Sequence, residues 1–313
     1  MHTRSSRVPG FLVVSALAAG VALLGLVRLA AQSTTHTVFV SVTDKTNKPI
    51  TDMQAADFEV KEGGKNAEIT GAKESTTPLR LKLLVADQGT GGFQNGSLQF
   101  LQKLLGRGEF AITGIVVQPE KLVDYTSNTD ALSEALRKLG ARGRQAGAQL
   151  MEALQDAMKD LRSEGKRSVL VVMRVGGEAP STISGDSLRE QLRKSGATLY
   201  VVSIAGADKA APSQVTGSDA VSVAQGQLKN DEMTSGALAL GQILGDGSKE
   251  SGGRNEQIVS TTMVPVMEGI ADELLHQYEV SYTVSAQSKP GDKLQVSSKR
   301  KNVVVRAPSR LSN

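Results

Sequence analysis

The residues that decide the fold are LKLLVAD at positions 81–87, which run directly into QGTGG at positions 88–92. A short, nearly continuous apolar run between turn residues is typical of a strand buried on both faces of a parallel sheet. The run ends in the carboxylate of Asp87, and three glycines lie in the loop after it. Ligands of open α/β sheets bind where strands end at the carboxyl edge. We therefore expect Asp87 at a position suited to a binding residue.

Beyond this strand, predicted strands and helices alternate as far as residue 276. Strands are expected at 110–117, 121–126, 168–175, 198–205 and 257–260. Helices are expected at 97–105, 129–139, 148–163, 187–195, 237–245 and 264–276. This alternation implies right-handed crossovers, and therefore an α/β fold with a doubly wound, mostly parallel sheet and helices on both faces. The charged strand 121–126 is expected at an edge, the polar residues 206–235 as an insertion with little structure, and 248–255 as a glycine-rich loop.

Both ends of the chain instead show the two-residue alternation of half-buried strands. These strands are expected at 37–43, 57–62, 67–70, 278–284, 293–297 and 303–306. The group near the start is too short to bury a core alone. We therefore predict that residues 36–76 and 277–308 form one small β-sandwich-like module, with the α/β domain (79–276) inserted between them.

Residues 1–31 have the pattern of an export signal. Arg4 and Arg7 form a positive start, an apolar stretch rich in alanine and glycine follows, and small residues near Ala31 suit cleavage. The alternative is an uncleaved anchor, because the apolar stretch is at the short end of what spans a bilayer and Arg28 closes it. In both cases the body of the chain is expected to be secreted or to lie in the periplasm or cell envelope. It would meet a membrane only through this segment, if uncleaved.

The composition excludes several kinds of function. Three of the 36 lysine and arginine residues, and none of the 32 acidic residues, lie in residues 1–31, so the body of the chain is almost neutral. It lacks the clustered basic charge expected of a nucleic-acid-binding protein. The chain has no cysteine, which excludes disulfides and cysteine-ligated metals. None of the three histidines has a partner at triad or metal spacing, and no nucleophile-elbow motif is present. We therefore predict that the protein is not an enzyme.

Several short motifs follow one another in a fixed order. They are VTDK at 42–45, KPI at 48–50, DFEV at 57–60, LLVAD at 83–87 and QYEVSY at 277–282. Their succession over residues 37–306 resembles that of bacterial VWFA-related domain proteins, which are exported and combine a von Willebrand factor A domain with a short β-rich segment. The resemblance implies an adhesion-type domain that interacts with other proteins.

Domains of this family often carry a metal-ion-dependent adhesion site. The family pattern has Asp-x-Ser-x-Ser after the first strand, a threonine in a middle loop and an aspartate after the fourth strand. Mg²⁺ prefers six oxygen ligands in near-octahedral geometry. In this chain glycines replace both serines after Asp87, Ala148 stands for the threonine and Val175 for the aspartate. The resemblance therefore implies a degenerate site, and we predict no cofactor and no tight metal binding.

The binding candidates that remain near this edge are Asp87, Thr90, Arg174 and Glu178. If a weak Mg²⁺ site is retained, its ligands are expected to be Asp87, Thr90 and Glu178. Arg174 adds a positive charge that can take the place of the cation. Asp87 also has a structural interpretation, because a carboxylate at a strand end can accept hydrogen bonds from loop amides.

Two hypotheses of function follow from these residues. The first is a non-catalytic module that binds an unknown protein partner, in the cell envelope or outside the cell, without a metal. The second is a hydrolase or small-ligand binder that uses Asp87 and Glu178. Acid–base chemistry would need the two carboxyl groups within about 5–10 Å of each other. The first hypothesis is preferred, because the fold pattern is complete while the metal ligands are missing.

Overall fold

The computed structural model describes residues 34–179, 181–205, 234–284 and 292–311 of the 313-residue chain. The predicted export signal and nearly all of the polar segment 206–235 lie outside the described residues. None of the helices in the described ranges is long and apolar enough to cross a membrane. Export and membrane attachment therefore stay predictions.

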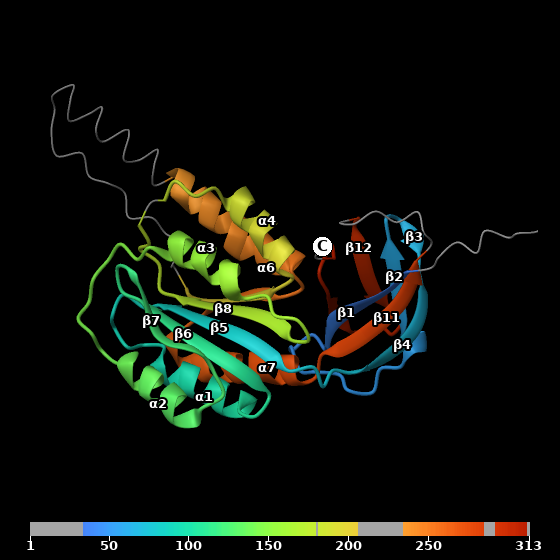
Figure 1. Cartoon of the computed structure of the whole chain (residues 1–313), viewed down its shortest axis with the longest axis horizontal. Helices are drawn as coiled ribbons and strands as arrows, with labels where there is room; N and C mark the ends of the chain where they lie inside the picture. Colours follow the sequence, from blue (N-terminus) through green and yellow to red (C-terminus); the bar gives the residue numbers. More distant parts are fainter. Residues whose placement is uncertain (1–33, 180, 206–233, 285–291, 312–313) are drawn as a thin grey trace, which may run out of the picture.

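The α/β domain is built on a six-stranded sheet in the order β10-β9-β8-β5-β6-β7 (Figure 1). Its strands are β5 (Leu79–Ala86), β6 (Gly108–Ile115), β7 (Pro119–Thr126), β8 (Arg167–Arg174), β9 (Thr198–Ile204) and β10 (Arg254–Ile258). Neighbouring strands run parallel except β7, which is antiparallel to β6 at the edge. The predicted doubly wound, mostly parallel sheet is confirmed.

Strand β5 lies between β6 and β8, and its side chains alternate between two cores. Leu83 packs into the core on one face and Leu84 into the core on the other, and both are buried. Leu83 is in register with Ile112 of β6 and with Val171 of β8. A strand that is paired on both edges and covered on both faces requires an apolar sequence nearly throughout, which is the pattern at 81–86.

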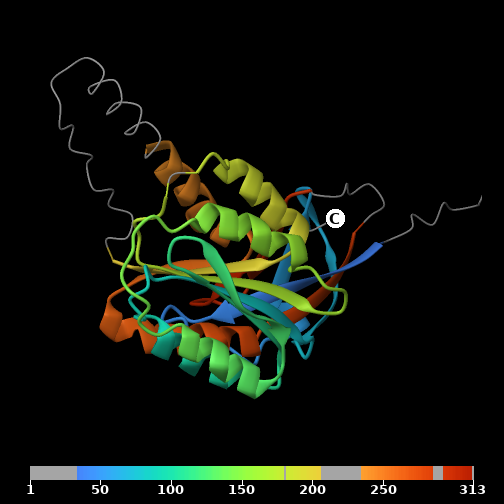
Figure 2. The ribbon, with the colours of Figure 1, turned by 60° about the vertical axis from the view of Figure 1, so that its left-hand side comes forward.

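Two layers of helices enclose this sheet (Figures 1 and 2). One layer consists of α1 (Gln94–Leu104), α2 (Thr129–Lys138) and α7 (Met263–Leu275). The short 3₁₀ turn η3 (Ser260–Thr262) directly precedes α7. The other consists of α3 (Leu150–Asp160), α4 (Gly185–Ser195) and a helical segment made of residues 234–240, η2 (Gly241–Gly247) and α6 (Ser248–Glu250).

Helix α2 begins at residue 129, as predicted, whereas helix α3 ends before its predicted end. Helix α2 is capped by Asn128, whose side-chain oxygen accepts hydrogen bonds from the N–H groups of Asp130 and Ala131, both at 2.9 Å. An amide oxygen before the first turn satisfies backbone donors that lack a partner within the helix. Helix α3 ends at Asp160, short of the expected end at residue 163.

The glycine-rich stretch 248–255 is more regular than the predicted loop. The helical segment continues to Glu250, and β10 begins at Arg254. The reason is the buried hydroxyl of Ser251, which accepts a hydrogen bond from the N–H of Leu199 at 2.9 Å. This contact with β9 fixes the turn, and it joins residues that are far apart in the sequence.

The two ends of the chain form a separate module of two small antiparallel sheets, as predicted (Figure 1). The sheet orders are β13-β1-β11-β4 and β12-β2-β3. The elements are β1 (Thr34–Thr43), η1 (Ala55–Asp57), β2 (Phe58–Glu62), β3 (Lys65–Asn66), β4 (Glu68–Glu74), β11 (Tyr278–Val284), β12 (Leu294–Ser298) and β13 (Val304–Arg306). They share a core that includes Val40, Phe58 and Tyr278. We call this unit the β module.

A buried ionic cluster joins the α/β domain to the β module. Glu273 of α7 accepts a hydrogen bond from the hydroxyl of Tyr200 at 3.0 Å, and its other oxygen lies 3.1 Å from Arg254 and 3.5 Å from Arg306. Arg306 belongs to β13 and also donates to the Thr43 hydroxyl of β1 at 3.1 Å. Burial, together with the Glu273 carboxylate, raises the pKa of Tyr200 well above its ordinary value. One carboxylate thus ties β9 and β10 to the last strand of the β module.

Candidate functional site

Asp87 follows β5 at the carboxyl edge of the central sheet, and it is completely buried. Its Oδ1 accepts hydrogen bonds from the N–H of Gly89 at 2.9 Å and from Nη2 of Arg142 at 2.6 Å. Its Oδ2 accepts a hydrogen bond from the N–H of Gly91 at 2.8 Å. Gln88, Gly89 and Gly91 have positive φ angles, which turn the loop back on the carboxylate. Asp87 therefore anchors its own loop.

The glycines that replace the family's serines lie against the loop that follows α2. A Cβ atom at Gly89 would come within 2.3 Å of the carbonyl oxygen of Gly143. A Cβ atom at Gly91 would come within 2.7 Å of the backbone nitrogen of Ala141. The N–H of Arg142 donates to the carbonyl oxygen of Gly89 at 2.8 Å, so main-chain bonding holds the two loops together. Serine side chains do not fit these positions while the second loop is in place.

Arg142 reaches from this second loop to the carboxylate of Asp87. Its side chain is 18% exposed, against 0% for Asp87. The guanidinium also packs on β6, where a Cβ atom at Gly114 would lie 2.5 Å from Nη1 of Arg142. In the described part of the chain, Nε and Nη1 of Arg142 are buried without a hydrogen-bond partner. Arg142 is therefore held mainly by its charge contact with Asp87 and by packing.

Arg174 and Glu178 form a second buried pair near the same edge. Nε of Arg174 donates to Oε1 of Glu178 at 2.6 Å, and Nη2 donates to Oε2 at 2.8 Å. Their side chains are 3% and 4% exposed. Such a two-point contact between a guanidinium and a carboxylate is strong and directional. The predicted site residues thus divide into the Asp87 loop, which includes Thr90, and the Arg174–Glu178 pair.

Thr90 is the exposed member of the four predicted binding residues. Its hydroxyl donates to the carbonyl oxygen of Asp87 at 2.9 Å and accepts from the N–H of Gly92 at 3.2 Å. The hydroxyl is therefore used within the loop, while the rest of the side chain faces solvent.

The carboxylate oxygens predicted as weak Mg²⁺ ligands have other partners in the structure. Mg²⁺ needs oxygen ligands in octahedral geometry, but the oxygens of Asp87 and Glu178 are taken by N–H donors. Ala148 and Val175 have apolar side chains where the family pattern has oxygens. Within the described ranges, no group of three or more histidine, aspartate or glutamate residues is arranged to hold a metal ion. The positive charge beside Asp87 is supplied by Arg142.

The sequence pointed to Arg174, and not to Arg142, as a positive charge that can take the place of a cation. In the structure Arg174 pairs with Glu178, and the cation in contact with Asp87 is Arg142. The sequence signal was GARGR at 140–144, a basic stretch between glycines directly after α2. This stretch contributes to the site only because its loop folds over Asp87, and the local sequence does not reveal that contact.

No protein-family model and no curated protein matches the sequence. Solved structures show partial similarity. The von Willebrand factor type A protein from Catenulispora acidiphila has 9% identity and a TM-score of 0.40, covering 90% of this chain and 75% of that one. The vWF domain of the type V pili tip protein Mfa5 from Porphyromonas gingivalis has 11% identity and a TM-score of 0.41, covering 64% and 96%.

Proximal thread matrix protein 1 from the mussel byssus has 9% identity and a TM-score of 0.41, over 65% of this chain. The matched region spans only about half of that protein, 49% of its length. At these identities the likeness concerns the fold alone. The α/β domain itself has a mostly parallel six-stranded sheet between two helix layers.

Proposed function

We propose that the protein is an exported, non-catalytic module that binds another protein through the carboxyl edge of its central sheet, without a metal ion. The observation that supports this most directly is the pair of Asp87 and Arg142, with Nη2 to Oδ1 at 2.6 Å. At the position where the family pattern would place a cation to bridge to a partner, the chain supplies its own guanidinium. Contact with a partner then depends on the side chains and main chain of the surrounding loops.

Exposed residues at this edge supply the contact surface, which we call the loop surface and define by Thr90, Arg144 and Val259. Thr90 and Arg144 lie in the two loops that meet over Asp87, and Val259 follows β10 directly and is 54% exposed. Arginine is enriched in protein interfaces, and the fully buried core of an interface is more apolar than the rest of the protein surface. The buried Asp87, Arg174 and Glu178 keep these loops in shape rather than touching the partner.

The test is a comparison of the proteins captured from an envelope extract of the source organism. The immobilised protein is compared with Arg144→Glu and Val259→Asp, two changes at exposed positions of the loop surface. Lys301→Glu, an exposed position in the β module, is the matched control. We expect both loop-surface variants to lose at least one captured protein that the wild type and the control retain, with or without EDTA.

Two results would contradict the proposal. Identical capture by all variants would exclude the loop surface as the binding site. Loss of the captured protein in EDTA, restored by Mg²⁺, would show that binding depends on a metal.

The alternative function, a hydrolase or small-ligand binder that uses Asp87 and Glu178, has less support. Each carboxylate is occupied by its own arginine, and Asp87 is completely buried. A general acid or base must exchange protons with a bound substrate. In this geometry neither carboxyl group is free to contact one.

A further inference from the structure

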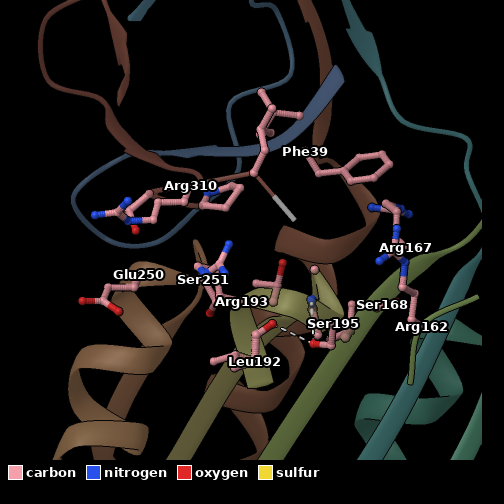
Figure 3. Close-up of a pocket in the computed structure, with 18 of the residues that line it drawn as sticks. Phe39, Arg162, Arg167, Ser168, Leu192, Arg193, Ser195, Glu250, Ser251 and Arg310 are labelled. Atoms are coloured by element: carbon pink, nitrogen blue, oxygen red, sulfur yellow. Dashed lines mark hydrogen bonds between the residues drawn. The ribbon is translucent and has the colours of Figure 1, made fainter. Parts of the chain in front are cut away.

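A cavity of ≈ 990 Å³ lies between the α/β domain and the β module (Figure 3). It is bordered by the first residues of β8 and β9, by β1, by the end of α4 and by residues 308–311. It is therefore at the amino edge of the sheet, the opposite edge from Asp87. We call it the inter-module cavity. Its volume is at the upper end of the range of about 300–1,000 Å³ that is usual for ligand pockets.

Arg167, the first residue of β8, places a buried cation in the wall of this cavity. It is 5% exposed. Its Nη1 donates to the carbonyl oxygen of Leu274 at 2.8 Å and to Oε1 of Gln277 at 2.9 Å, and its Nε donates to the carbonyl oxygen of Thr77 at 2.9 Å. These acceptors are neutral, and no carboxylate among the described residues forms an ion pair with Arg167. Burial lowers the pKa of Arg167 to about 10.

Basic side chains outnumber acidic ones in the lining. Seven lining residues, Arg167 included, are lysine or arginine, and four are aspartate or glutamate. Asp186 and Glu250 both pair with Arg189, and Glu190 pairs with Arg193. Three of the four acidic groups are thus engaged by arginines of the cavity itself, and none of these three is bonded to Arg167. The lining therefore contains more basic than acidic side chains, although Lys166 also pairs with Glu109 outside the cavity at 2.7 Å.

Phe39 of β1 gives the cavity an apolar side next to this cation. The ring centroid lies 5.8 Å from Cζ of Arg167, and Figure 3 shows the two side chains next to each other in the cavity wall. A bare inorganic ion would use only the charge. A ligand with an apolar body would also cover the half-buried ring and gain from removing it from water.

We propose that the inter-module cavity binds an organic anion, a ligand with a carboxylate, phosphate or sulfonate group on an apolar body. The anionic group accepts hydrogen bonds from Nη2 of Arg167, the guanidinium nitrogen that has no acceptor among the described residues. Arg193 at the end of α4 adds to the positive field, and the apolar body lies against Phe39. The loop surface is at the other edge of the sheet, so the test of this site is independent of the test of the proposed protein-binding function.

The test measures binding of the aromatic sulfonate 8-anilinonaphthalene-1-sulfonate to the full chain by fluorescence titration. We expect saturable binding that Arg193→Gln weakens by about threefold, since Arg193 is partly exposed. Arg167→Lys keeps the charge but loses the Nη2 donor, and we expect it to weaken binding by about tenfold. Circular dichroism establishes first that the Arg167→Lys protein is folded. If it is not, Arg193→Gln decides the result.

The matched control is Arg137→Gln on α2. Arg137 pairs with Glu134 three residues away, as Arg193 pairs with Glu190, but it lies outside the cavity. Equal affinity in the Arg137→Gln and Arg193→Gln proteins, or no saturable binding at all, would overturn the proposal. Competition identifies the ligand chemistry. Benzoate is expected to displace the probe at lower concentration than inorganic phosphate, and the reverse order would contradict the need for an apolar body.

Discussion

Replacing Arg142 with alanine is expected to lower the free energy of unfolding by about 3 kcal/mol, because it leaves the completely buried carboxylate of Asp87 without its cation. The Gly89 and Gly91 amides still solvate that carboxylate, so the loss is expected at the low end of the range for broken buried pairs. Urea denaturation followed by circular dichroism measures the change. A loss below about 1 kcal/mol would mean that the pair is no stronger than an ordinary surface ion pair.

Arg144→Ala is the matched control, because Arg144 lies in the same loop and is exposed. We expect it to change stability by less than about 0.5 kcal/mol. In the double variant Asp87→Ala with Arg142→Ala, the loss is expected to be smaller than the sum of the two single losses. Residues in direct contact couple in this way, since removing both charges avoids leaving either one buried alone.

Replacing Glu273 with glutamine is the second change expected to have a large effect, about 3 kcal/mol of lost stability. The glutamine keeps the size of the side chain but removes the negative charge shared by Arg254 and Arg306. Arg254 retains Glu256 as a partner, whereas Arg306 is left with neutral acceptors, the side chains of Thr43 and Asn47. Because Arg306 belongs to β13, we expect the variant to be destabilised mainly at the contact between the β module and the α/β domain.

Thermal unfolding by calorimetry, together with limited proteolysis, measures this second effect. Glu268→Gln, on the same helix α7, is the control, because the structure shows no ion pair for Glu268 among the described residues. If both variants unfold at the same temperature and are cut at the same rate, the Glu273 cluster does not stabilise the junction.

The fold was predictable from the sequence because its signals are local. The apolar run at 81–86 is buried on both faces, and the alternating residues at 278–284 form β11 with those bounds. The turn at 248–255 was harder to predict. The Ser251 hydroxyl that orders the 248–255 stretch does so by bonding to β9, and no pattern within the stretch indicates that contact.

The candidate site was predictable only in part. The position of Asp87 at the carboxyl edge follows from the strand before it, and the loss of serine oxygens is visible in the sequence. The sequence does not reveal which residue contacts Asp87. Arg142 lies 55 positions later in the chain, and it reaches Asp87 because two loops pack together. Glycine at 89 and 91 was interpreted as a loss of ligands. The structure adds a physical reason for it, since the backbone of the second loop occupies the space of those side chains.

The most direct test of whether Arg142 replaces a metal ion is titration of the purified protein with Mg²⁺. Calorimetry and thermal unfolding follow the titration. A site with a Kd of about 10 µM would add about 4 kcal/mol of stability at roughly 10 mM Mg²⁺. We expect no binding heat and an unchanged unfolding temperature. Micromolar binding by the wild-type protein that Asp87→Ala abolishes would contradict the metal-free site.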